Sequence, residues 1–168
     1  MDSLPVFPSA RSRMVIALCC HVLLPVLIGA GIYTLWRSNG LLVFEWYRWA
    51  GVYEAVEAVR RQSSSLQRTI PSFVRYSLPD ALWVYAFTAL MCLVWAERLQ
   101  SKERTFWVLL PLCVAIGSEF GQLIKVVPGT FDWADVLGYI AAFAGAYIIT
   151  SVQYRWVQST FGESANET

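Results

Sequence analysis

The sequence has few charged residues for its length. Of its 168 residues, 13 are lysine or arginine and 12 are aspartate or glutamate, so that 15% of the chain is charged. Soluble domains carry about 25% charged residues. The formal net charge of +1 also leaves no excess of basic residues for binding nucleic acid. These shortages exclude a disordered tail, a nucleic-acid-binding module and an ordinary cytosolic enzyme.

Cysteine and histidine, which form disulfides and many metal sites, are also scarce. The four cysteines all fall inside apolar stretches and include no CxxC pair: Cys19, Cys20, Cys92 and Cys113. This spacing argues against a disulfide framework or a zinc site, so we interpret the cysteines as packing residues. His21 is the only histidine and has no second ligand at a suitable spacing. We expect it to be buried and to form hydrogen bonds within the protein, and we expect neither a metal nor a cofactor.

The sequence contains several long apolar stretches. Hydrophobic residues make up 57% of the chain, and a helix that crosses a bilayer needs about 20 predominantly apolar residues. Four stretches approach or exceed that length: about 14–36, 79–97, 105–125 and 134–155. The first is too long for the apolar core of a signal peptide, which has about 7–15 residues. We therefore predict an all-α polytopic membrane protein in which residues 1–168 form a single membrane domain with four transmembrane helices.

The tryptophans support these boundaries. Indole rings favour the headgroup level of a bilayer, and six of the eight tryptophans lie close to the ends of the predicted spans. These are Trp36, Trp83, Trp95, Trp107, Trp133 and Trp156. The other two lie in the connection between the first and second spans, which we therefore expect to touch the membrane interface.

That connection contains an amphipathic segment. From Trp49 to Val59, apolar residues recur at helical spacing while charged residues occupy the other side. We predict an interfacial helix over residues 41–61, followed by a polar linker over 62–76. Two interpretations stay open: a passive anchor in the interface, or a docking surface for another copy of the chain or for a partner membrane protein. The residues proposed for either contact are Trp46, Trp49, Tyr53 and Val56.

The basic residues indicate an orientation. The short connection between the second and third predicted spans carries Arg98, Lys102 and Arg104. Short loops that are rich in lysine and arginine stay on the cytoplasmic side. We therefore expect this loop and both termini to be cytoplasmic, with membrane lipids as partners of the spans.

Polar residues near the bilayer gather on one predicted face. Because successive spans alternate in direction, the ends of the first and third spans lie on the same side as the starts of the second and fourth. The candidate polar site on that side consists of Arg75, Asp80, Glu119, Gln122, Asp132 and Asp135. No spacing within this group identifies a catalytic residue.

Glu119 is the most informative member of the group, because it is the one charged residue well inside a predicted span. An ionisable residue in a span is costly unless it is paired or hydrated, so it indicates a functional site. Gln122 follows at i+3 on the same helix face, and Arg75 is the candidate cationic partner. The alternative is a polar contact that holds helices together.

The aspartates also have two interpretations. Asp132 is suited to cap the fourth span, and Asp135 stands three residues later, as in a capping box. The same two carboxylates, opposite Glu119, are equally suited to bind a divalent cation or to transfer a proton. Asp80 is suited to the first turn of the second span, with Ser77 as its cap.

Small residues recur at one-turn spacing in the last two predicted spans. They include Gly117, Gly121, Gly138 and Gly145. Such residues permit close approach of helix backbones in membranes, so we expect these glycines to lie at helix contacts.

A family resemblance runs through the same residues. The motifs are Glu119-Phe-Gly-Gln122, Pro128-Gly129, Phe131-Asp132 and Asp135-Val-Leu-Gly138. This pattern resembles the core of the VanZ-like family of small bacterial membrane proteins, with Thr130 where the family has an arginine and Tyr139 where it has an asparagine. The resemblance implies a compact multi-helix fold in the bacterial cytoplasmic membrane and a link to the cell envelope, with glycopeptide (teicoplanin) resistance as the family's namesake. It implies no particular reaction.

Two functions are compatible with these observations. The first is a membrane-embedded enzyme, binding protein or transporter that acts on an amphipathic envelope precursor through Glu119 and the nearby carboxylates. The second is a non-catalytic membrane subunit, sensor or scaffold that contacts other copies or a partner. The loss of the family's arginine and asparagine, together with the aromatic connection, favours the second.

Overall fold

The computed structural model describes residues 10–96, 98 and 101–162, and this part of the chain is helical, with no strand. In chain order the elements are α1 (Ala10–Leu18), the π-helical turn η1 (Cys19–Leu23), α2 (Leu24–Trp36), α3 (Leu42–Trp49), α4 (Tyr53–Gln67), α5 (Ser72–Tyr76), α6 (Leu78–Val94), α7 (Lys102–Leu123) and α8 (Trp133–Gly162).

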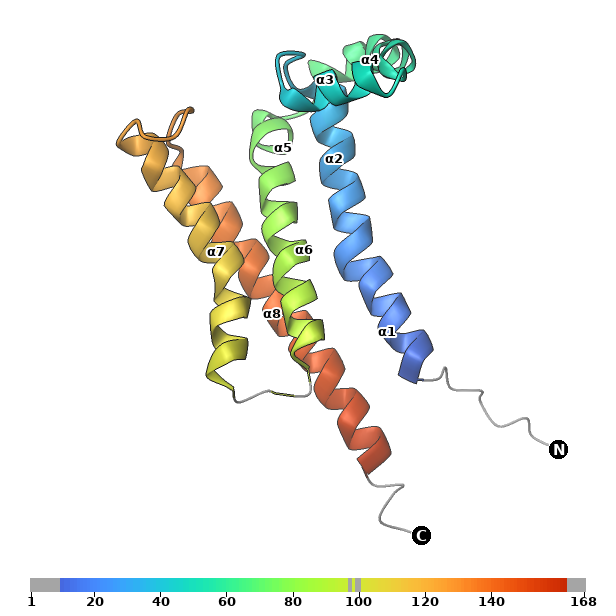
Figure 1. The fold of residues 1–168 in the computed structure, drawn as a ribbon, viewed down its shortest axis with the longest axis vertical. Coiled ribbons are helices and arrows are strands. Elements are labelled where there is room, and N and C mark those ends of the chain that lie inside the picture. Colours follow the sequence, from blue (N-terminus) through green and yellow to red (C-terminus); the bar gives the residue numbers. More distant parts are fainter. Residues whose placement is uncertain (1–9, 97, 99–100, 163–168) are drawn as a thin grey trace, which may run out of the picture.

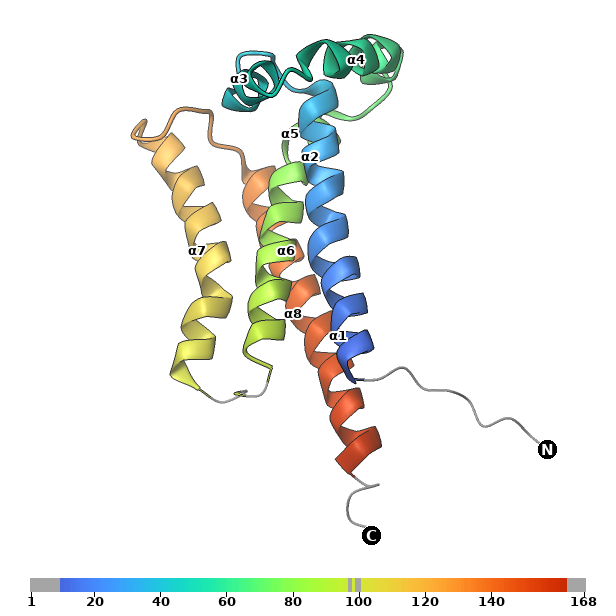
Figure 2. The same cartoon turned by 45° about the vertical axis from the view of Figure 1, so that its right-hand side comes forward.

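The long helices run alternately in opposite directions (Figure 1). The rod formed by α1, η1 and α2 lies on one side of α6 and α7 lies on the other, while α8 runs behind α6 and crosses it. The start of α1, the end of α6, the start of α7 and the end of α8 share one end of the bundle, which we call the terminal end. Both α3 and α4 lie across the opposite end, the cap end, in both views (Figure 2).

Three helices in the described part of the chain are long and apolar enough to cross a membrane. They are Arg11–Trp36, Lys102–Leu123 and Trp133–Gln153. They coincide with three of the four predicted spans, so the all-α prediction is confirmed and the chain is compatible with an integral membrane protein. The second predicted span corresponds to α6, a shorter apolar helix that ends at Val94. Glu97, at the predicted end of that span, lies outside the described residues.

Small residues explain why α6 occupies the centre of the bundle. Ala86 and Ala89 are buried, which lets neighbouring helices come close to the α6 backbone. Gly29 of α2 packs on Pro79 of α6, where an added Cβ would lie 3.3 Å from the carbonyl oxygen. On the other side, Tyr139 of α8 packs against buried residues of α6. The short helix is therefore held between two long ones.

The π-helical turn in the first long helix lies directly before Pro25. Proline has no N–H, and in an α-helix its ring clashes with the carbonyl group four residues earlier, here that of His21. The wider turn gives this carbonyl room, and the Leu24 N–H bonds to the Cys19 carbonyl five residues back. A π-turn of this kind often marks a functional position, and this one places His21 toward α6.

The connection between α2 and α6 differs from the prediction. Instead of one helix over 41–61 and a linker over 62–76, the chain forms α3, a break, α4 and the short α5. Gly51 makes the break with a φ of +72°, which glycine adopts without strain. The second helix continues through three serines, and Ser63 and Ser64 bond their hydroxyls to carbonyl oxygens three residues earlier.

The glycines on α7 do not have the predicted packing role. A Cβ added at Gly117 would meet no atom within 4 Å, and one at Gly121 would meet Val127 in the following turn rather than another helix. On α8, Gly138 lies against α6, whereas Gly145 has no neighbour within 4 Å. Among the described glycines, Gly29 of α2 is the one that would bring an added Cβ closest to the backbone of another helix, that of α6.

Candidate functional site

Glu119 lies near the cap end of α7 and is only 2% exposed. Its carboxylate accepts hydrogen bonds from the Gln122 amide (3.2 Å), the Tyr139 hydroxyl (3.3 Å) and the Asp132 backbone N–H (3.3 Å). The donors come from α7 itself, from α8 and from the turn that precedes α8. Three donors satisfy a buried carboxylate and offset much of the cost of removing it from water.

The contact with Asp132 makes Glu119 part of the N-terminal cap of α8. The Asp132 carboxylate accepts a bond from the Ala134 backbone N–H (2.8 Å), so its predicted role as N-cap is observed. In a capping box, Asp135 would accept the N–H of the N-cap residue. Here Glu119 of α7 accepts that N–H instead. One oxygen of Asp135 is buried without a hydrogen-bond partner.

The α7–α8 turn packs against the Gln122 side chain. Gly129 has a φ of +141°, a conformation that residues with a side chain rarely adopt. A Cβ added to it would also overlap the Gln122 side chain. The Pro128-Gly129 turn therefore packs directly on the amide group that donates to Glu119, and a side chain at position 129 would displace that group.

Asp80 lies at the start of α6 and pairs with an arginine that the sequence analysis did not select. The Arg37 guanidinium is 3.8 Å from its carboxylate and lies over the ring of Tyr76, 5.2 Å from the centroid. The predicted cap is absent, because Ser77 makes no side-chain capping bond. Asp80 also lies close enough to Glu119 and Asp135 to interact with their charges. Three carboxyl groups on three helices thus share one region at the cap end.

Arg75 is not joined to this group by an ion pair among the described residues. Its guanidinium lies over the Tyr76 ring, 5.3 Å from the centroid, and its Nε is buried without a hydrogen-bond partner. The cation nearest the carboxyl group of Asp80 is Arg37, so the structure differs from the predicted pairing of Arg75 with Glu119.

Sequence reasoning missed Tyr139 and Arg37. Tyr139 lies seven residues after Asp132 and four after Asp135, so helical spacing places all three on neighbouring parts of one face. Arg37 directly follows the first predicted span, on the face where the other polar residues were expected. Both signals were present in the sequence, but neither identifies a partner without the arrangement of the helices.

The carboxyl groups in the described part of the chain do not assemble a set of three metal ligands. Within residues 10–96, 98 and 101–162, no three histidine, cysteine, aspartate or glutamate side chains come together as ligands. The divalent-cation interpretation of Asp132 and Asp135 therefore has no support in the described part of the chain.

His21 forms the predicted hydrogen bonds within the protein, although its side chain is half-buried rather than buried. Its Nδ1 lies 2.8 Å from the Tyr85 hydroxyl on α6, and its Nε2 lies 3.1 Å from the Gln153 amide on α8. Both ring nitrogens are thus used in contacts between helices. This group belongs to the terminal half of the bundle, away from the carboxyl groups.

The Arg60 side chain of α4 forms hydrogen bonds to the end of α2. Its guanidinium donates to the main-chain carbonyls of Thr34 and Arg37, the latter at 2.8 Å, and pairs with Glu57 at 3.1 Å. It also lies over the fully buried ring of Phe44 from α3. The Thr34 carbonyl belongs to the last turn of α2 and Arg37 is the residue that follows the helix, where positive charge is favourable. The two transverse helices are therefore held by specific contacts.

The outer face of α3 carries unpartnered apolar side chains. Trp49 is 92% exposed, and Trp46 and Leu42 are also largely exposed on the same side of the helix. The other two residues predicted for interface contact, Tyr53 and Val56, are half-buried, and Arg48 lies over the Tyr53 ring. Of the four predicted contact residues, the two largely exposed ones are thus on α3, and α4 exposes other apolar side chains, Val59 and Leu66.

Comparisons with known protein families, with curated proteins and with solved structures found no match. The VanZ-like resemblance therefore stays a prediction. The structure does define two of the positions that depart from it. Tyr139 donates to Glu119 where the family pattern has asparagine, and Thr130 is exposed in the α7–α8 turn where it has arginine.

Proposed function

We propose that this chain is a VanZ-like integral protein of the bacterial cytoplasmic membrane that acts as a non-catalytic subunit, sensor or scaffold. The observation that carries this proposal is the burial and hydrogen bonding of the Glu119 carboxylate. This carboxylate is buried and accepts three hydrogen bonds, two of which, from Tyr139 and the Asp132 N–H, join α7 to α8 and its preceding turn. A general acid or base has to reach its substrate, whereas this carboxylate already serves the packing of its own helices.

The proposal includes four spans, with α6 as the shortest. Its 17 residues extend about 26 Å at 1.5 Å per residue, against about 30 Å for the hydrocarbon core. The short helix α5 precedes it with only Ser77 between them, which lengthens the helical segment. The position of α6 between α2 and α8 supports the same depth for all of them.

In this arrangement α3 and α4 lie in the membrane interface. They cross the ends of the long helices (Figure 1), and α3 exposes Trp46 and Trp49 on its outer face. Tryptophan favours the headgroup level, and amphipathic helices lie in the interface plane. The basic Arg98–Arg104 connection at the opposite end supports a cytoplasmic location for the terminal end.

A second candidate is an enzyme, binding protein or transporter for an amphipathic envelope precursor. The observation that favours it is the proximity of the Asp80, Glu119 and Asp135 carboxyl groups, together with the unpartnered oxygen of Asp135. Carboxyl groups that lie close together in a low-dielectric region are suited to hold or transfer a proton.

Glu119→Gln separates the two candidates. The test uses a strain in which the gene has a measurable phenotype, such as a change in glycopeptide susceptibility. If Glu119 is catalytic, the variant should lose this phenotype while the amount of protein in the membrane stays normal. The proposed structural role predicts that activity falls only as far as the level of folded protein falls. Glu103→Gln is the matched control, because Glu103 is an exposed glutamate in the first turn of the same helix. Loss of the phenotype at an unchanged protein level would refute the non-catalytic proposal.

A further inference from the structure

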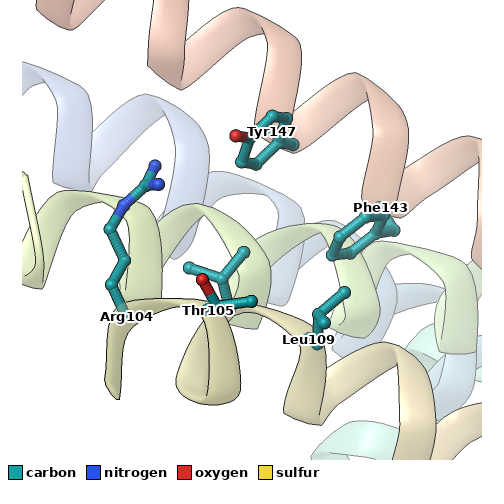
Figure 3. A pocket seen from close by; sticks show the side chains of 6 residues that line it. Arg104, Thr105, Leu109, Phe143 and Tyr147 are labelled. Atoms are coloured by element: carbon teal, nitrogen blue, oxygen red, sulfur yellow. The ribbon is translucent and has the colours of Figure 1, made fainter. Parts of the chain in front are cut away.

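A cavity of about 260 Å³ lies between α7 and α8, on the terminal side of the bundle. It is lined by Arg104, Thr105, Val108, Leu109, Phe143 and Tyr147 (Figure 3). Arg104 and Glu119 are 15 positions apart on α7, or about 22 Å along the helix axis. The cavity is therefore separate from the carboxyl group at the cap end.

The cavity has a buried floor and an open mouth. Arg104 is 8% exposed and Val108 is buried, whereas Leu109 and Tyr147 are each 40% exposed. Because these residues lie on the sides of two long helices, the mouth opens sideways from the bundle. In the proposed membrane location, a lateral opening faces lipid rather than water.

The lining combines one positive charge with an apolar wall. The Arg104 guanidinium extends toward Tyr147 across the cavity and lies 5.6 Å from the centre of its ring (Figure 3). Leu109 and Phe143 supply apolar surface beside the arginine. This combination is complementary to a molecule with an anionic group at one end and a hydrocarbon chain at the other.

The order of these residues along α7 matches the depth profile of a lipid. Arg104 is in the first turn of the helix, where a spanning helix meets the headgroup layer. Leu109 lies five residues further on, about 7.5 Å deeper along the axis. A phosphate at the level of Arg104 would thus place its acyl chain beside Leu109 and Phe143. Arginine is well suited to phosphate because its planar guanidinium donates two parallel hydrogen bonds.

We propose that the α7–α8 cavity binds one anionic glycerophospholipid, with its phosphate on Arg104 and part of an acyl chain along Leu109 and Phe143. This inference rests on the proposed membrane location of α7 and α8. It assigns a lipid ligand to the terminal end of the bundle, independently of Glu119 and the other carboxyl groups.

Native mass spectrometry of the full chain in mild detergent tests the proposal. Phosphatidylglycerol, phosphatidylcholine or inorganic phosphate is titrated in, and lipid-bound chains are counted. We expect one phosphatidylglycerol per chain, bound more tightly than phosphatidylcholine. Arg104→Gln should weaken its binding about tenfold, as expected for loss of a charged hydrogen bond. The control Lys102→Gln removes the same charge from an exposed position two residues away and should change binding less than twofold.

A second pair of variants leaves Arg104 in place. Leu109→Trp fills the cavity and should weaken phosphatidylglycerol binding to a similar extent. Val114→Trp adds the same bulk to a largely exposed position on α7 outside the cavity and should leave binding unchanged. If Arg104→Gln does not yield folded protein, this pair decides the question.

Several results would overturn the lipid assignment. One is unchanged phosphatidylglycerol binding in both Arg104→Gln and Leu109→Trp, and another is equal binding of the two lipids. A third is displacement of the lipid by an equal concentration of inorganic phosphate, which would indicate a site for free anions. Release of the chain from membranes by alkaline carbonate would contradict the membrane proposal itself. A chain that resists carbonate but shows no selective lipid binding contradicts only the lipid assignment.

Discussion

The Tyr139 hydroxyl and the Glu119 carboxylate are joined by a 3.3 Å hydrogen bond between buried side chains of α8 and α7. The two residues are 20 positions apart and lie on opposite sides of the α7–α8 turn. Their bond joins the two helices, and the Gln122 amide and the Asp132 N–H donate to the same carboxylate. The most deeply placed charge in the described part of α7 is thus a link between two helices.

Tyr139→Phe tests the strength of this link. The ring keeps its packing against α6, but Glu119 loses one of three donors, so we expect the free energy of unfolding to fall by about 0.5–2 kcal/mol. Denaturant unfolding in detergent micelles measures the change. Tyr147→Phe is the control, because Tyr147 is 40% exposed and should give a change close to zero. Equal effects of the two substitutions would show that the hydroxyl of Tyr139 adds nothing.

Gly129→Ala should be more damaging than its size suggests. The φ of +141° is unfavourable for alanine, and the new methyl group would overlap the Gln122 side chain. We expect a loss of about 1–3 kcal/mol in the free energy of unfolding. Gly117→Ala is the contrasting variant, since its Cβ meets no atom within 4 Å, and it should be neutral or stabilising by up to about 1 kcal/mol. A reversed order would contradict the packing of the turn on Gln122.

Arg60→Ala should release α4 without unfolding the long helices. The substitution removes the donors to the end of α2 and the ion pair with Glu57. We expect faster hydrogen exchange and faster proteolysis within Leu42–Gln67, with the spans unchanged. Arg61→Ala is the control, because the neighbouring side chain is exposed. If both variants exchange at the same rate as the unmodified chain, the Arg60 contacts do not hold the transverse helices.

Replacing Trp46 and Trp49 together by serine distinguishes a docking surface from a passive anchor. The subunit proposal expects the double variant to lose an assembly that survives purification in mild detergent, because these rings form the exposed face of α3. Light scattering coupled to size-exclusion chromatography measures the mass. Trp133→Ser changes another largely exposed tryptophan outside α3 and should retain the assembly. An unchanged mass in the double variant would indicate that α3 only anchors the chain in the interface.

Local patterns in the sequence were sufficient to predict the long helices. Run length identified the stretches that became α1–α2, α6, α7 and α8, because backbone hydrogen bonds in a helix are satisfied within the segment itself. Gln122 beside Glu119 and the Asp132 cap were predictable for the same reason, since i+3 contacts and N-caps depend on a few consecutive residues. The break at Gly51 was missed because its φ depends on how α3 and α4 dock on α2.

The charge deficit and the apolar run lengths by themselves determined that the chain is all-helical and suited to a membrane. Only the tertiary structure decided which charges meet. In the structure Asp80 pairs with Arg37, and Ser77 does not act as a cap. The Tyr139 hydroxyl donates to Glu119, and the Arg75 guanidinium lies over the Tyr76 ring. The physical reason is that helix formation is a local property of the chain. The pairing of charges depends on the relative rotation and depth of helices that are distant in sequence.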